Sequence, residues 1–78
     1  MPNLLPLQLL PSGQRARIDQ LLGRADDVHR LQELGMRVGS HVEMLQTGSP
    51  CIVKLDGARL AYRDNEGGSV LVRVGDAG

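Results

Sequence analysis

Hydrophobic and polar residues alternate along most of this chain. Between Gln14 and Leu22, Ala16 and Ile18 fall on one face while charged residues fall on the other. A period of two predicts a half-buried strand. The same alternation returns in four later segments, which we also predict to be strands: 40–46, 51–55, 58–63 and 69–74.

The period changes to three between Asp26 and Leu34, which predicts one short helix. Its apolar face consists of Val28, Leu31 and Leu34. Asp26 or Asp27 can cap the N-terminus of the helix, and Gly35 stands where a left-handed C-terminal cap falls.

Turn signals separate the predicted strands. Asp56-Gly57 favours a type I′ turn and a tight hairpin. Prolines interrupt the first 13 residues, where we expect a short strand or a single turn to pack Leu7, Leu9 and Leu10 on the body. The order strand, helix, then strands joined by short turns predicts a small, mainly β fold. We expect a partly open β-barrel of five or six strands, with the short helix inserted after the first long strand.

Composition narrows the class of protein. The 78 residues suffice for one domain, with a core at about 5–74 and a flexible tail at 75–78. Nine basic residues balance nine acidic ones, which argues against binding nucleic acid or a membrane by charge alone. No apolar run approaches the ~20 residues of a transmembrane helix. The first 13 residues make a poor signal peptide, and Cys51 has no partner for an internal disulfide, so we expect a cytoplasmic protein.

The sequence contains few residues that could form a catalytic site. Cys51 and two histidines are the only candidates for a nucleophile and its base, and Cys51 is more simply a small buried residue. Gly35 and Gly39 do not form a phosphate-binding pattern. We therefore expect no enzymatic activity and no required cofactor.

Two pairs of residues have a spacing suited to metal binding. His29 and Glu33 are four apart on the predicted helix, on the face opposite its apolar stripe, and His41 and Glu43 are two apart on a strand. Each pair supplies two ligands, whereas a structural zinc usually has four. Either these are solvated surface residues, or His29 and Glu33 hold a divalent ion, zinc or ferrous iron, that bridges two copies as a homodimer.

Several segments together resemble the FeoA family, the small accessory proteins of bacterial ferrous-iron uptake. The stretch LQELGMRVG at 31–39 is similar to that family's helix-to-turn signature. VEML at 42–45, PCIVKL at 50–55 and LAYR at 60–63 follow in the family's order. Val38 stands where the family often has Pro, Tyr62 where Leu is usual, and Gly67 where Ala is usual.

The resemblance implies an SH3-like β-barrel with a helical insertion and no catalytic group. It implies a non-catalytic accessory protein that binds and modulates the cytosolic side of the membrane ferrous-iron transporter FeoB, which carries a GTPase domain. The same fold occurs as the C-terminal module of some metal-dependent repressors. The alternative is therefore a free-standing regulatory module that senses a divalent metal or binds such a repressor.

Candidate partner-binding residues are chosen from their expected exposure, with core packing as the alternative for Leu34 and Met36. They form two segments: Leu34, Gly35, Met36 and Arg37, and the loop Thr47, Gly48, Ser49 and Pro50. Two arginine pairs, 15 with 17 and 59 with 63, are either solvated charge or a rim that meets an acidic partner. Proline-rich peptides and nucleic acids are disfavoured because Tyr62 is the only aromatic residue.

Overall fold

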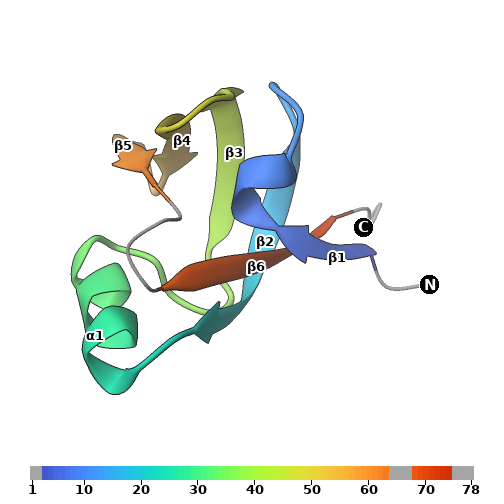
Figure 1. The fold of residues 1–78 in the computed structure, drawn as a ribbon. Helices are drawn as coiled ribbons and strands as arrows, with labels where there is room; N and C mark the ends of the chain where they lie inside the picture. The colour runs from blue at the N-terminus through green and yellow to red at the C-terminus, as the bar shows by residue number, and fades with distance from the viewer. Residues whose placement is uncertain (1–2, 64–67, 75–78) are drawn as a thin grey trace.

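A computed structural model of the chain describes residues 3–63 and 68–74. Six antiparallel strands form one sheet in the order β1-β6-β2-β3-β4-β5. The sheet curls into a partly open barrel, and one helix lies at one end of it (Figure 1). The elements are β1 (Asn3–Pro6), the 3₁₀ turn η1 (Leu7–Leu9), β2 (Arg15–Leu22), α1 (Ala25–Glu33), β3 (His41–Gln46), β4 (Cys51–Leu55), β5 (Ala58–Tyr62) and β6 (Ser69–Val74). The predicted mainly β fold with a short helix after the first long strand is confirmed.

The alternation of apolar and polar residues along each strand explains which side chains form the core. Successive side chains of a strand point to opposite faces, so each strand turns its apolar set inward. The buried apolar residues come from β2 to β6, the helix, the turn after the helix and the segment at η1: Leu7, Leu10, Ala16, Ile18, Leu31, Met36, Val42, Met44, Cys51, Val53, Leu55, Tyr62, Val70 and Val72. Nearly all are aliphatic or sulfur-containing, as the composition requires.

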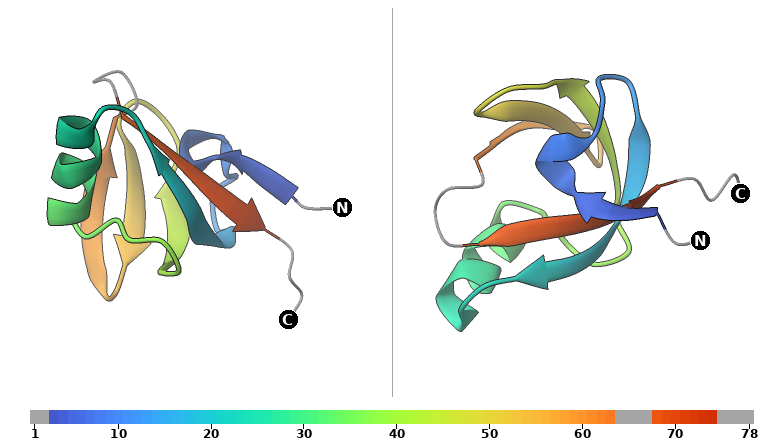
Figure 2. Two further views of the ribbon diagram at one scale, coloured as in Figure 1. Left: turned by 90° about the horizontal axis from the view of Figure 1, so that it is seen from below. Right: turned by 45° about the vertical axis from the view of Figure 1, so that its right-hand side comes forward.

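Two irregularities bend the sheet. The register shifts in β2 between Ile18 and Gln20, and in β3 between Met44 and Gln46. An extra residue in one strand of an antiparallel pair increases the local twist. These two bulges therefore help one sheet to curve back over its own core (Figure 2).

The hairpin of β4 and β5 turns where the sequence predicts. Asp56 and Gly57 both have positive φ, at 52° and 83°. A type I′ turn requires positive φ at both central residues, which Gly adopts without a side-chain clash and Asp tolerates better than most residues. The turn fixes the register, with Leu55 opposite Ala58 and Lys54 opposite Arg59.

The helix begins one residue earlier than predicted, and its N-cap is Arg24 rather than an aspartate. The carboxylate of Asp27 instead accepts a hydrogen bond from the backbone N–H of Arg24, at 3.2 Å. Asp27, the third residue of the helix, thus provides an acceptor for the N-cap amide. Its negative charge also interacts favourably with the helix dipole at this end.

Leu9 is the clearest error in the predicted core. Its side chain is 63% exposed, whereas Leu7 and Leu10 are buried. The segment 7–9 is a 3₁₀ turn, in which residues three apart share a face. Leu7 and Leu10 therefore point inward together and Leu9 points out. The predicted tail at 75–78 and Gly67 lie outside the described residues.

Candidate functional site

The two predicted partner-binding segments lie at opposite ends of β3. Residues 34–40 lead from α1 into the start of this strand, and the loop 47–50 follows its end (Figure 1). Six residues of strand separate them by roughly 17 Å. Thr47, Gly48 and Ser49 are exposed and Pro50 is half-buried, but the structure does not bring this loop together with Leu34 and Arg37.

Met36 is predicted above to be an exposed partner-binding residue, and this prediction is wrong. It is fully buried in the core. Its backbone N–H donates to the carbonyl oxygen of Leu31, and that of Gly35 donates to Gln32, both at 3.0 Å. This is a Schellman ending, which usually brings an apolar residue after the glycine against the last turn of the helix. Core packing, the alternative, is therefore correct for Met36.

The other residues of this turn are on the surface. Leu34 is 47% exposed and Val38 is 64% exposed, and Arg37 between them is also exposed. Gly35 has a φ of +107°, and a Cβ built there would meet Leu55 Cδ2 at 3.3 Å. The left-handed cap therefore lets the chain reverse and leaves two apolar side chains in water.

A groove runs beside this turn, between α1 and the end of β5. Its cavity volume is about 170 Å³. It is lined by Asp27, Arg30, Leu31, Leu34, Ala61, Tyr62, Arg63 and Gly68. Gly68 allows the close approach, because a Cβ there would lie 3.2 Å from Leu31 Cδ1. Most of the residues that line the groove are apolar, and Arg30 and Arg63 also line it. Such a composition is typical of a protein–protein interface.

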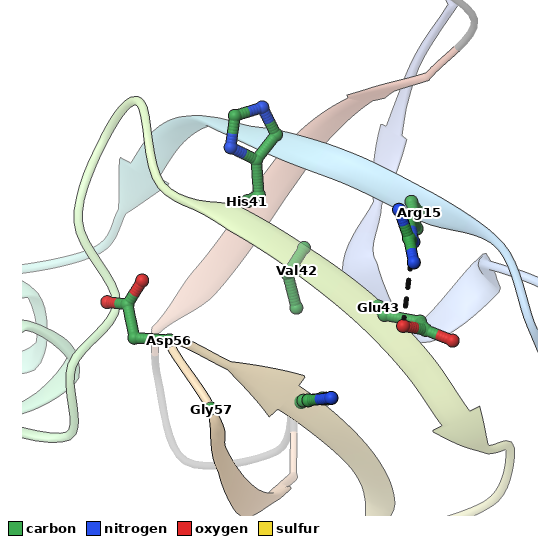
Figure 3. A pocket seen from close by; sticks show the side chains of 7 residues that line it. Arg15, His41, Val42, Glu43, Asp56 and Gly57 are labelled. Carbon is green, nitrogen blue, oxygen red and sulfur yellow. Dashed lines mark ion pairs between the residues drawn. The ribbon is translucent and has the colours of Figure 1, made fainter.

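A second, larger hollow lies on the outer face of the sheet beside the β4–β5 turn (Figure 3). Its volume is about 400 Å³, and its lining consists of Arg15, His41, Val42, Glu43, Lys54, Asp56 and Gly57. Arg15 and Glu43 are opposite each other on β2 and β3, with Nε 3.6 Å from Oε1. The sequence alone does not reveal this hollow, because its residues come from three strands and a turn.

Neither of the two predicted metal-binding pairs forms a complete metal site. His29 Nε2 lies 3.9 Å from Glu33 Oε2, and the two side chains are 71% and 68% exposed. The carboxylate of Glu43 is directed to Arg15 rather than to His41 (Figure 3). Over 3–63 and 68–74, no group of three or more potential ligands is placed to hold a metal ion. One copy of the described chain therefore does not provide a four-ligand site.

Cys51 is a poor nucleophile. Its side chain is fully buried, and Sγ lies 3.5 Å from the carbonyl oxygen of Tyr62, to which it donates. Burial raises the pKa of the Cys51 thiol, partly offset by a backbone hydrogen bond. The reactive thiolate is therefore disfavoured.

No helix within the described ranges has the length and hydropathy to span a bilayer.

Comparisons with known proteins find one family model and several similar structures. The FeoA domain matches residues 5–74, whereas no curated protein matches the sequence. A crystal structure described as an iron uptake regulatory protein (FeoA) is 25% identical, with a TM-score of 0.82 over 90% of this chain and 96% of that one. The solution structure of FeoA from Chlorobium tepidum is 27% identical, with a TM-score of 0.76 over 90% and 70%.

FeoA from Stenotrophomonas maltophilia is also similar, with 31% identity and a TM-score of 0.74 over 87% of this chain and 88% of that one. That protein was crystallised with zinc. It is described as a prokaryotic SH3 domain protein and proposed as a bacterial ferrous iron transport activating factor. The predicted SH3-like fold is thereby confirmed.

Proposed function

The chain belongs to the FeoA family, and we propose that it is a cytoplasmic, non-catalytic accessory protein of bacterial ferrous-iron uptake. It binds the cytosolic side of a FeoB-type transporter and modulates it. The match to the FeoA domain over residues 5–74 carries this proposal. The description of the Stenotrophomonas relative as a transport-activating factor supports it.

The contact surface that we propose is the docking patch, defined as Leu34, Arg37, Val38 and the adjoining groove. Leu34 and Val38 are among the most exposed large apolar residues of the described chain. Exposed apolar side chains beside a groove are typical anchors of an interface. Arg30 and Arg63 at the groove have no ion-pair partner among residues 3–63 and 68–74, and we propose that they meet carboxylates of the transporter. The loop 47–50 is then a separate candidate at the far end of β3.

We propose that binding at this patch changes the transporter's state. A partner that binds one conformation better than another shifts the equilibrium by the ratio of the two affinities. The accessory protein then needs no chemistry of its own. It acts by stabilising one conformation or one nucleotide state of the transporter.

Ferrous-iron uptake in cells tests the proposal. Cells lacking the chain regain uptake with the wild-type protein but not with Leu34→Asp. The matched control is Leu9→Asp, which changes an exposed leucine on η1, remote from α1 (Figures 1 and 2). Full uptake with Leu34→Asp, at equal protein level, contradicts the proposed patch; normal uptake without the chain contradicts the function.

The alternative function, metal sensing by a free-standing regulatory module, has two observations in its favour. His29 and Glu33 present two ligands on an exposed helix face, and the Stenotrophomonas relative is known with zinc. A second copy must complete the site. Zinc would then shift the elution volume of the wild-type protein toward a dimer and would leave His29→Ala unchanged. An unchanged elution volume for the wild-type protein rules out the bridged dimer.

A further inference from the structure

The outer face of the sheet carries positive charges that the fold itself does not require. On this face β4 and β5 place Lys54 directly opposite Arg59. Side chains opposite each other in an antiparallel pair have Cβ atoms about 4.5–5.5 Å apart, and like charges there are destabilising. Neither cation has an ion-pair partner among the described residues.

A second like-charge pair occurs on the same outward side of the sheet. Arg17 on β2 is opposite Arg73 on β6. Asp19, the bulge residue of β2, accepts hydrogen bonds from Nε and Nη2 of Arg73, both at 3.2 Å. Arg17 is left without an ion-pair partner in the described chain, and its neighbour across the other side is His41 on β3.

Strand pairing joins Arg15, Lys54 and Arg59 in one row across four strands. Glu43 lies between Arg15 on β2 and Lys54 on β4, and Arg59 follows on β5. Neighbouring strands are about 4.8 Å apart, so the row extends over roughly 14 Å. Arg15, Glu43 and Lys54 of this row line the hollow of about 400 Å³, and Asp56 is also part of its lining.

We infer that this outer face binds a carboxylate-rich segment of a protein, through Arg15, Arg17, Lys54 and Arg59. Arginine pairs well with carboxylates because its planar fork can donate two parallel hydrogen bonds. Bound carboxylates would relieve the repulsion between Lys54 and Arg59. The segment is defined by its charge, so this inference is independent of the transporter and of the docking patch.

The mixture of charges favours carboxylates over a nucleic acid. Glu43, Asp19 and Asp56 are interspersed with the cations, so spaced carboxylates can meet the cations and avoid these acids, whereas a phosphate backbone charged at every nucleotide cannot. Tyr62 is the only aromatic residue of the chain and is buried. No aromatic surface is therefore available to stack bases.

A titration of the ¹⁵N-labelled full chain tests the inference. The probe is a synthetic ten-residue peptide of alternating Glu and Ser, and a fifteen-residue oligothymidylate is run in parallel. We expect amide shifts grouped at 15–17, 41–43 and 54–59, which salt weakens. Shifts elsewhere, or tighter binding of the oligothymidylate, overturn the inference.

One substitution gives opposite results for binding and for stability. Arg59→Glu places an acid opposite Lys54, so the free protein should gain roughly 2–4 °C in Tm. The same variant should bind the peptide about tenfold more weakly, because one attraction becomes a repulsion. Arg24→Glu is the matched control, with the same charge change at an exposed arginine before α1, outside both the outer face and the docking patch. Equal weakening in both variants, or a Tm that falls in Arg59→Glu, overturns the inference.

Discussion

The backbone N–H of Met36 donates a hydrogen bond to the carbonyl oxygen of Leu31 at 3.0 Å, and both side chains are buried. This bond closes the last turn of α1 and directs the chain back toward β3. Two positions before and two positions after Met36, the side chains of Leu34 and Val38 are exposed. The same turn that anchors Met36 therefore presents the apolar part of the docking patch.

Gly35→Ala should destabilise the protein by about 1–2 kcal/mol, because an L side chain is disfavoured at a φ of +107°. The control is Gly39→Ala, where φ is +97° but a Cβ would meet nothing within 4 Å. Gly35→Ala should cost more, since Leu55 must also move. Urea unfolding measures both variants, and a smaller loss for Gly35→Ala than for Gly39→Ala would contradict the explanation.

Met36→Ala should lower the free energy of unfolding by about 2–5 kcal/mol, because it leaves a cavity in a well-packed core. Met36→Leu, which nearly preserves the volume, should cost less than about 1.5 kcal/mol. Thermal unfolding followed by circular dichroism compares the two. Similar Tm values for Met36→Ala and the wild type would show that the side chain is not packed as described.

Local patterns in the sequence predicted the elements well where one rule dominates. Ala16 and Ile18 alternate with charge and are buried on β2, and Asp56-Gly57 forms the expected hairpin turn. Leu9 shows the limit. An apolar residue in a short 3₁₀ turn can face either way, and only the packing of Leu7 and Leu10 decides it.

The sequence predicts the candidate site less well than it predicts the strands and the helix. The sequence favours an exposed Met36 after the helix, but the glycine before it reverses the chain and turns its side chain inward. Residues from separate strands form the outer-face hollow, so it depends on register. One signal was present in the sequence: a two-residue turn at Asp56-Gly57 already implies that Lys54 opposes Arg59.

Stability should fall at alkaline pH because of Cys51. Burial holds the pKa of its thiol above the unfolded value, so the folded state retains the proton where the unfolded state loses it. The stabilisation is complete below the unfolded pKa of about 8.5 and is lost progressively as pH rises above it. Urea unfolding of the wild type and of Cys51→Ala over pH 7–10.5 measures this. Parallel pH profiles for the two proteins would contradict it.

The central claim is that the docking patch binds a FeoB-type transporter. Its most direct test is a titration of the ¹⁵N-labelled protein with the transporter in nanodiscs, and separately with its soluble GTPase domain. We predict amide shifts grouped at residues 30–38 and 61–63, abolished by Leu34→Asp and kept by Leu9→Asp. Unchanged spectra with the intact transporter, in the presence of ferrous iron and a GTP analogue, would contradict the account.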